Sequence, residues 1–335
     1  MNQQEPLLCG CMVLAGGEGQ RMSTLIRSWL GRERPKQYCT FVGTRSMLKH
    51  TLDRVSSFVN GQQIVTVIGK NHLIRFWQNL GESLPGRILE QPVSLGTGTG
   101  IFLAATCILA NDPNATFLIL PSDHFVYPEH RFVAELKEMA RLAELFSNRL
   151  IVLGVKPDRP ETEYGWIQPG GERGERIRDV KKFREKPVSR EAVDLLFEPG
   201  SLWNTLVIAT KGHVLWRLGE RFFPRMLEKF GALRATLESA YRGQILDTRT
   251  GTNRIPLPPL TDVYEGLEVA DFSSDLLQRA PEQTLVYQMG DGLRWSDWGK
   301  PERVWESLQL IGKTPRFPRT LAFQNAVGNS LSPSQ

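Results

Sequence analysis

The segment from Leu7 to Gly19 constrains the fold of this chain more than any other stretch of its sequence. An apolar run from Leu7 to Ala15 leads directly into Gly16, Gly17 and Gly19. Such a run is typical of a buried strand that feeds a tight loop. Glycines let the loop bend sharply and bring its main-chain N–H groups against a ligand, which suits phosphate. The sequence therefore predicts a phosphate-binding loop after a buried first strand.

The residues after these glycines exclude two familiar phosphate-binding loops. A dinucleotide-binding G-x-G-x-x-G that starts at Gly17 needs a glycine where Met22 stands, and the G-K-[ST] ending of a P-loop is absent. Arg21 lies just beyond the glycines and offers a planar, permanently charged fork to phosphate oxygens. The alternative interpretation is a glycine-rich turn beside a solvated arginine.

Strand-like and helix-like patterns alternate along the first half of the chain. After the first strand we expect a helix at 46–59, a strand at 63–69, a helix at 99–110, a strand at 115–120, a helix at 131–146 and a strand at 149–155. This alternation implies an α/β fold, with a mostly parallel sheet and helices on both faces.

Beyond Val155 charged residues, glycine and proline become more frequent. Short β-like pieces at 164–168 and 177–183 precede helical patterns at 190–197 and 213–240, a loop at 246–262, and strands at 284–289 and 293–298. We therefore divide the chain into residues 1–155, residues 156–312 as the second half of the same domain, and a polar tail at 313–335.

Composition narrows the class of protein. The 335 residues include 41 basic and 36 acidic side chains, a formal net charge of +5 that is mild for this length. The chain lacks the dense basic run that marks a nucleic-acid groove, and its longest apolar stretch is about half of a membrane span. No secretory signal pattern opens the sequence, so we expect a cytoplasmic protein that binds neither nucleic acid nor membrane. The four cysteines form no disulfide framework, and Cys9 and Cys11 are expected in the core.

Three further motifs carry groups suited to a phosphorylated ligand. RPKQY (34–38) places Lys36 after a rigid proline, and QPVSLGTGTG (91–100) is a polar loop that enters a helix, where exposed amides suit anions or a nucleobase edge. FLILPSDH (117–124) puts Asp123 just past a central strand, where open α/β sheets bind ligands and a carboxylate can hold Mg²⁺. The plainer interpretations are a surface lysine, a capped loop and a helix N-cap.

Taken in order, these motifs resemble those of the sugar-1-phosphate nucleotidyltransferases, and most closely the mannose-1-phosphate guanylyltransferases, also called GDP-mannose pyrophosphorylases. The likeness runs from about Val13 to Trp305. Besides VLAGGEGQRM, PKQY and PSDH, it rests on YGWI (164–167), FREKP (183–187), SLWNT (201–205) and RWSDWGK (294–300). PKQY and WSDWG look most like the guanylyl branch.

The resemblance implies a Rossmann-like nucleotidyltransferase fold with a nucleotide-binding half at 1–155 and a smaller, β-containing sugar-phosphate-binding half at 156–312. It also implies an in-line displacement. A phosphate oxygen of a sugar 1-phosphate attacks the α-phosphorus of a nucleoside triphosphate, and pyrophosphate leaves. GTP and mannose 1-phosphate are the substrates it favours. Because the nucleophile is already an anion, catalysis consists of positioning and charge neutralisation.

The resemblance also assigns roles to individual residues. Arg21 would hold the departing pyrophosphate, Lys36 the nucleotide phosphates and Lys186 the sugar phosphate. Asp123 and Asp297 would share one Mg²⁺. The nucleotide would lie against Ala15, Gly16, Gly17, Gly19, Gln91, Gly96 and Thr97, and the sugar against Gly165, Glu185 and Asn204.

The chain departs from the family pattern at three places. The Pro-Leu pair that usually follows the arginine is replaced within Ser23-Thr24-Leu25, and the loop from there to Pro35 is longer. The family's W-N-S-G becomes Trp203-Asn204-Thr205-Leu206. Nothing after Trp305 resembles a left-handed β-helix or an isomerase domain.

Two alternatives stay open at the level of sequence. One is the same chemistry with another sugar 1-phosphate or another nucleoside triphosphate. The other is an inactive paralogue that binds a nucleotide sugar and regulates a partner, although the presence of Arg21, Lys36, Asp123 and Asp297 favours an enzyme. A homodimer is compatible with either. A glycosyltransferase would need a D-x-D-like metal motif where Pro121-Ser122-Asp123 stands.

Overall fold

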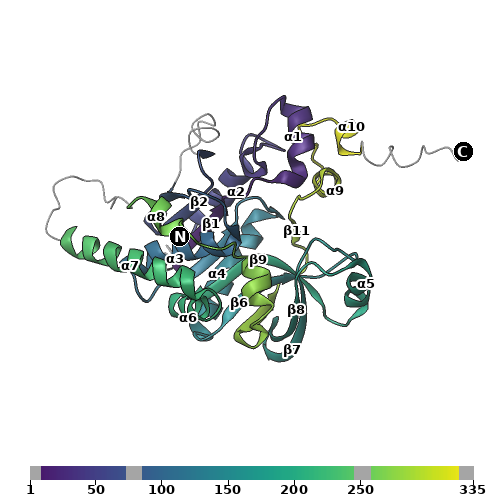
Figure 1. Ribbon diagram of the computed structural model, residues 1–335. Coiled ribbons are helices and arrows are strands. Elements are labelled where there is room, and N and C mark those ends of the chain that lie inside the picture. Colours follow the sequence, from purple (N-terminus) through teal and green to yellow (C-terminus); the bar gives the residue numbers. More distant parts are fainter. Residues whose placement is uncertain (1–8, 73–84, 245–257, 324–335) are drawn as a thin grey trace, which may run out of the picture.

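The structure is a computed structural model that describes residues 9–72, 85–244 and 258–323. Its centre is a nine-stranded sheet in the order β3-β2-β1-β4-β9-β6-β10-β8-β7 (Figure 1). The first half contributes the strands β1 (Cys9–Ala15), β2 (Ile64–Ile68), β3 (Arg87–Glu90), β4 (Thr116–Pro121) and β6 (Leu150–Val155). β1 pairs in parallel with β2 and β4, and β2 pairs in parallel with β3. The α/β class with a mostly parallel sheet is confirmed.

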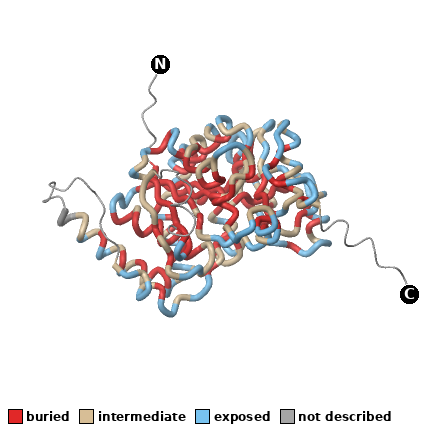
Figure 2. The backbone as a smooth tube through the Cα atoms, turned by 90° about the horizontal axis from the view of Figure 1, so that it is seen from above, coloured by how far each residue is buried: buried red, intermediate tan, exposed pale blue. Residues whose placement is uncertain are grey.

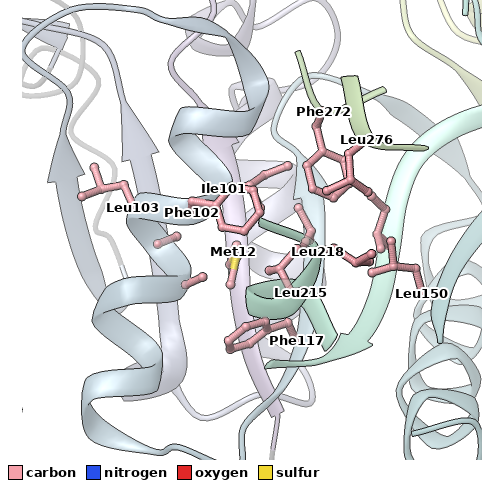
Figure 3. Close-up of a cluster of buried hydrophobic side chains, with 14 of the residues drawn as sticks. Met12, Ile101, Phe102, Leu103, Phe117, Leu150, Leu215, Leu218, Phe272 and Leu276 are labelled. Atoms are coloured by element: carbon pink, nitrogen blue, oxygen red, sulfur yellow. The ribbon is translucent and has the colours of Figure 1, made fainter. Parts of the chain in front are cut away.

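Helices cover both faces of the sheet because its strands alternate their side chains between two cores. In β1, Cys9 and Cys11 face α2 (Met47–Ser56) and α4 (Glu129–Leu145), whereas Met12 faces α3 (Gly96–Asn111). Both cysteines are buried and free, as expected for core residues. Figure 3 shows Met12 packed against Ile101 and Phe102 of α3. Buried backbone accordingly fills the middle of the molecule (Figure 2).

The second half extends the same sheet. It supplies the strands β7 (Trp166–Gly174), β8 (Ile177–Arg184), β9 (Leu202–Lys211) and β10 (Thr284–Gln288), and the helices α5 (Ser189–Phe197), α6 (Gly212–Phe222), α7 (Pro224–Gln244) and α8 (Leu260–Tyr264). β10 runs parallel to β6, whereas β9 lies antiparallel between β4 and β6. The sequence patterns did not predict β9, although it is central.

A small sheet brings a late segment to the end of β4. β5 (Phe125–Tyr127) pairs antiparallel with β11 (Arg294–Ser296), with Val126 opposite Trp295. β5 begins two residues after Asp123, and β11 ends one residue before Asp297. This pairing places the two aspartates in the same part of the fold, although they are far apart in the sequence.

A third hydrophobic cluster joins the long loop after Arg21 to the C-terminal segment. The loop contains α1 (Ser23–Leu30), which packs with α9 (Pro301–Gln309) and α10 (Arg319–Ala322), and the three lie together in Figure 1. Phe317 is buried between Trp29 and Phe41, with ring centroids 5.8 and 6.1 Å away. Within the described part of the expected tail 313–335, Phe317 and Ala322 are buried in this cluster, whereas Lys313 and Arg316 are exposed. Within the described residues, no helix is long and apolar enough to cross a membrane.

Candidate active site

The glycine loop after β1 is held in shape by a buried glutamine. Gln37 donates from Nε2 to the carbonyl oxygens of Ala15 and Gly17, each at 2.8 Å. Gly19 has φ +63°, and a Cβ there would lie 3.1 Å from the amide nitrogen of Lys36. The PKQY motif therefore packs directly on the loop, and Gln37 positions it. The sequence motif contained Gln37 but gave it no role.

The glycine loop opens on a cavity of about 280 Å³ at the carboxyl ends of β1 and β4. This is the edge where open α/β sheets bind ligands. Six of the seven predicted nucleotide-binding residues line it: Gly16, Gly17, Gly19, Gln91, Gly96 and Thr97. Ala15, the seventh, ends β1 and contributes its carbonyl to Gln37 instead.

The wall of this cavity around Gln91 and Thr97 depends on Tyr264 and Phe272, from a part of the chain for which the sequence patterns predicted no element. Tyr264 donates from its hydroxyl to Oε1 of Gln91 at 3.1 Å, which leaves Nε2 of that amide facing Gly16. A Cβ on Gly16 would lie 2.7 Å from this Nε2, so a larger residue there would displace the Gln91 amide. Thr97 accepts the N–H of Phe272 at 2.9 Å, which ties the start of α3 to the same segment.

A second cavity, of about 560 Å³, adjoins the first and shares Gly19, Ser94 and Asp123 with it. Arg21 and Lys36 also line it. Lys36 is almost fully buried, and its ammonium lies 2.8 Å from Oδ2 of Asp123. The same ammonium donates to the main-chain oxygen of Asp297. Lys36 therefore bridges the two predicted metal-binding aspartates.

Arg21, which also lines the second cavity, contacts the carboxylates of Asp297 and Glu163. It is half-exposed and donates to Oδ2 of Asp297 at 2.9 Å and to Glu163 at 3.0 Å. A Cβ on Gly299 would lie 2.7 Å from Cζ of Arg21, so the glycine of WSDWG makes room for this contact. Because the guanidinium is paired with protein carboxylates, a bound phosphate would have to compete for it.

Asp297 is anchored by a buried network that the sequence did not reveal. Its Oδ1 accepts from Arg303 at 2.7 Å, from the Tyr164 hydroxyl at 2.6 Å and from the Gly299 N–H at 3.0 Å. Arg303 also pairs with Glu161, and with Glu163 at 3.0 Å. Oδ1 is thus committed to the protein, whereas Oδ2 contacts only Arg21 among the described residues. Arg303 lies on α9, where an arginine in an amphipathic pattern looks like a surface residue.

Both aspartates are ionised at neutral pH despite their burial. Burial alone would raise the pKa of Asp297, but Lys36 and then Arg303 outweigh it and hold that pKa well below its usual range. The pKa of Asp123 is likewise lowered, because the ammonium of Lys36 outweighs burial. Burial lowers the pKa of the neighbouring His124 to about 4, so that imidazole is neutral.

The predicted sugar-binding residues meet around Tyr164. A Cβ on Gly165 would lie 2.6 Å from Oε2 of Glu185, and this oxygen is buried with no hydrogen-bond partner among the described residues. Lys186 donates its backbone N–H to the carbonyl of Tyr164 at 3.2 Å, and its side chain is largely exposed. Tyr164 in turn contacts Asp297, which connects this group to the carboxylates of the cleft.

Asn204 joins the same group, and its surroundings explain one departure from the family pattern. Its N–H donates to the carbonyl of Gly165 at 2.8 Å, and its Oδ1 accepts the N–H of Leu206 at 3.1 Å. Leu206 has φ +56°, in the left-handed region that glycine adopts freely. The chain therefore keeps the backbone turn that a glycine would make here, at a cost of roughly 1 kcal/mol. Leu206 also lines the first cavity.

Asp123 and Asp297 have the chemistry of a magnesium site. Both are ionised oxygen donors beside Lys36, which contacts the carboxylate of Asp123 and the main-chain oxygen of Asp297. A cation could bind Oδ1 of Asp123 directly, whereas Oδ2 of Asp297 would first have to release Arg21. The described residues include no group of three acidic, histidine or cysteine side chains that could hold a metal ion. Two carboxylates suffice where Mg²⁺ keeps water and substrate phosphate in its shell. The residues therefore fit this ion, and its binding stays a prediction.

Comparison with known proteins agrees with this architecture. The family model described as nucleotidyl transferase matches residues 11–228. Mannose-1-phosphate guanylyltransferase RfbM of Salmonella typhimurium is 31% identical over 198 residues, which cover 58% of this chain and 40% of the relative. Mannose-1-phosphate guanylyltransferase of Escherichia coli is 25% identical over 320 residues, covering 90% of this chain and 61% of the relative. The chain thus spans roughly half the length of these relatives.

Solved structures share the fold. The crystal structure described as mannose-1-phosphate geranyltransferase of Thermus thermophilus superposes with a TM-score of 0.72, at 24% identity, over 91% of this chain and 79% of that one. A UDP-glucose pyrophosphorylase complexed with UDP-glucose superposes with a TM-score of 0.54, at 16% identity, over 91% of this chain and 99% of that one. At these identities the likeness concerns the fold alone.

Proposed function

This chain belongs to the nucleotidyl transferase family, and from that premise we propose that it joins a sugar 1-phosphate to a nucleoside triphosphate with release of pyrophosphate. One observation carries the proposal. Lys36 touches Asp123 from the first half and Asp297 from the second, in a cleft that begins at the glycine loop. Cations and carboxylates thus gather where a triphosphate and a second phosphate would meet.

The proposed step is a displacement at the α-phosphorus of the triphosphate. A phosphate oxygen of the sugar 1-phosphate forms the new bond to phosphorus, and the bond to the β-phosphate oxygen breaks. No proton has to be removed, so the protein supplies alignment and compensating charge. Lys36 would contact the nucleotide phosphates from its buried position. Arg21 would leave Asp297 and Glu163 and bind the pyrophosphate as charge builds on it.

The sugar side of the proposal rests on the group around Tyr164. Glu185 has a buried, unpartnered carboxylate oxygen that a sugar hydroxyl could satisfy, and Asn204 lies beside Gly165 on β9. Lys186 is exposed enough to reach the sugar phosphate. Mg²⁺, when bound by Asp123 and Asp297, would neutralise part of the phosphate charge that accumulates there.

GTP and mannose 1-phosphate are the substrates we propose, because relatives that match most of this chain are named mannose-1-phosphate guanylyltransferases. The orientation of Gln91 agrees, since Nε2 faces the cavity as a donor and a guanine carbonyl is an acceptor. We carry forward a cytoplasmic location and a possible homodimer as parts of this proposal. Gel filtration with light scattering tests the second.

The test of the proposed function is pyrophosphate release across a matrix of nucleoside triphosphates and sugar 1-phosphates. We expect the GTP and mannose 1-phosphate pair to give the highest rate. If another pair gives the highest rate, the proposed reaction stands and the proposed substrates are wrong. Nucleotide binding without turnover for any pair would favour the inactive paralogue.

The metal part has its own test, which does not depend on turnover. Free Mn²⁺ measured by electron paramagnetic resonance should fall further when the protein is added to a solution that already contains Mn²⁺ and GTP. Asp123→Asn and Asp297→Asn should each weaken this binding. If both variants bind Mn²⁺ as the parent chain does, the two aspartates do not hold the ion.

A further inference from the structure

A separate cavity of about 350 Å³ lies between α2, the first turn of α4 and the segment after α9. It shares only His124 with the first cavity and no lining residue with the second. Its volume falls in the range of roughly 300–1,000 Å³ that holds small-molecule ligands. None of the roles assigned so far uses it.

The polar side of this cavity is basic. Arg54 lines it from α2, and Arg45 lines it from the turn before that helix. Lys313 lines it from the segment after α9. Glu129 is the carboxylate in its wall, and it is shared by Arg45 at 3.4 Å, Arg54 at 3.3 Å and His50 at 2.8 Å. Glu129 therefore contacts two permanently charged side chains, Arg45 and Arg54, and Lys313 is a third cation of the wall.

One cation of this wall is left without a counterion. The ammonium of Lys313 has no ion-pair partner among the described residues. Arg45 is anchored on Asp53 at 2.9 Å and still reaches the cavity with a half-exposed guanidinium. Uncompensated positive charge in a partly enclosed space attracts an anion more strongly than the same charge on open surface.

Apolar and aromatic side chains also line the cavity. Phe41, Phe125, Trp298 and Ile311 line it, and the rings of Phe125 and Trp298 stack at 4.7 Å between centroids. A bare inorganic ion would leave this wall in contact with water. A ligand that matches both sides carries an anionic group and an apolar body.

We propose that this cavity is a second binding site, for a small organic anion with an apolar body such as a phosphate monoester or a carboxylate. Its anionic group would lie against Arg45 and Lys313, and its body against Phe125 and Trp298. Such a ligand would also act on the cleft, and this part rests on the proposed function. Phe125 follows Asp123 by two residues and Trp298 follows Asp297 by one, so an occupant braces both segments that carry the predicted metal ligands.

Calorimetric titration of the full chain with phenyl phosphate tests the site directly. Benzoate and inorganic phosphate are the second and third probes, which separate an organic phosphate, a carboxylate and a bare ion. We expect saturable binding of phenyl phosphate or benzoate, and much weaker binding of inorganic phosphate. Lys313→Gln and Arg45→Gln should each raise Kd about tenfold, the loss expected for one charge-assisted contact. Lys313 is exposed, so its variant should fold normally.

Two control variants locate the binding. Arg141→Gln removes an exposed arginine of α4 that does not line the cavity. Arg21→Gln alters the cleft. Neither should change Kd. Absence of saturable binding for both organic probes, or a Kd that Lys313→Gln and Arg45→Gln leave unchanged, would overturn the site.

The effect on the cleft is measured as pyrophosphate release at saturating probe. We expect the rate to change at least about twofold in the parent chain, and half of this change to require about tenfold more probe in Lys313→Gln. An unchanged rate at full occupancy would refute the coupling and leave the site itself standing. Because binding is measured without turnover, a failure of the proposed function is distinguishable from a failure of this site.

Discussion

Replacing Arg303 should damage the protein more than replacing any exposed arginine. Arg303 is 5% exposed and is shared by Asp297, Glu161 and Glu163, and the first two of these are themselves buried. In Arg303→Gln these carboxylates stay in the interior without the guanidinium that they share. Removing one partner of a buried ion pair costs about 3–5 kcal/mol. At about 2 °C per kcal/mol for a chain of this size, Tm should fall by about 6–10 °C.

The pH dependence separates lost ion pairing from lost packing. The pKa of Asp297 is depressed in the folded chain, with Lys36 and Arg303 as the causes that outweigh burial. Its pairing therefore stabilises the fold above the unfolded pKa of about 4, and that contribution is lost as pH falls. The difference in Tm between parent and variant should shrink between pH 6 and pH 3. A difference that stays constant would indicate packing alone.

The assay is thermal unfolding followed by circular dichroism in metal-free buffer. Arg141→Gln is the matched control, because Arg141 pairs with Glu138 on the surface and its loss should change stability by less than about 1 kcal/mol. A fall in Tm for Arg303→Gln no larger than that of this control would refute the reasoning. Such a result would mean that the contact of Arg303 with Asp297 does not stabilise the fold.

Three other substitutions have definite expected outcomes. Arg21→Lys keeps the charge and loses the fork, so kcat should fall about a hundredfold with Tm unchanged, and near-parental kcat would show that Arg21 is a surface residue. Tyr264→Phe removes the donor to Gln91 and should raise the KM for GTP about fivefold with little change in the KM for the sugar phosphate, and equal changes in both would contradict a role in base recognition. Phe317→Ala should cost about 3–5 kcal/mol in chemical denaturation, whereas Phe197→Ala, at a side chain that is mostly exposed, should cost almost nothing, and equal costs would show that the C-terminal segment is not part of the core.

The sequence predicted the elements whose side chains follow a simple period. β1 and β2 are continuous apolar runs, and α2 and α4 carry apolar residues at helical spacing. The sequence patterns did not predict β9, because its apolar pattern is interrupted by Asn204, Thr205 and the left-handed Leu206. Its identity as a central strand comes from β4 and β6, which pair with it from both sides.

The residues of the site likewise fall into those that the sequence predicted and those that it did not. Motif residues such as Gly16, Lys36 and Asp123 were predicted, and the structure brings them to one cleft, where their roles stay predictions. Gln37, Tyr264 and Arg303 were missed as positioning residues. Each acts through a contact with a residue distant in the sequence, such as Tyr264 on Gln91. The sequence around such a residue does not indicate which distant residue it contacts.

The cleft around Lys36 is proposed to transfer a nucleotidyl group to a sugar phosphate, and one labelling experiment tests this most directly. The measurement is ³¹P NMR of the full chain with Mg²⁺, GTP and mannose 1-phosphate labelled with ¹⁸O in its terminal phosphate oxygens. We predict GDP-mannose and pyrophosphate in equal amounts, with ¹⁸O in the bridge between the two phosphates of the nucleotide sugar and none in pyrophosphate. Release of orthophosphate, label in pyrophosphate, or GTP consumption without a nucleotide sugar would contradict it.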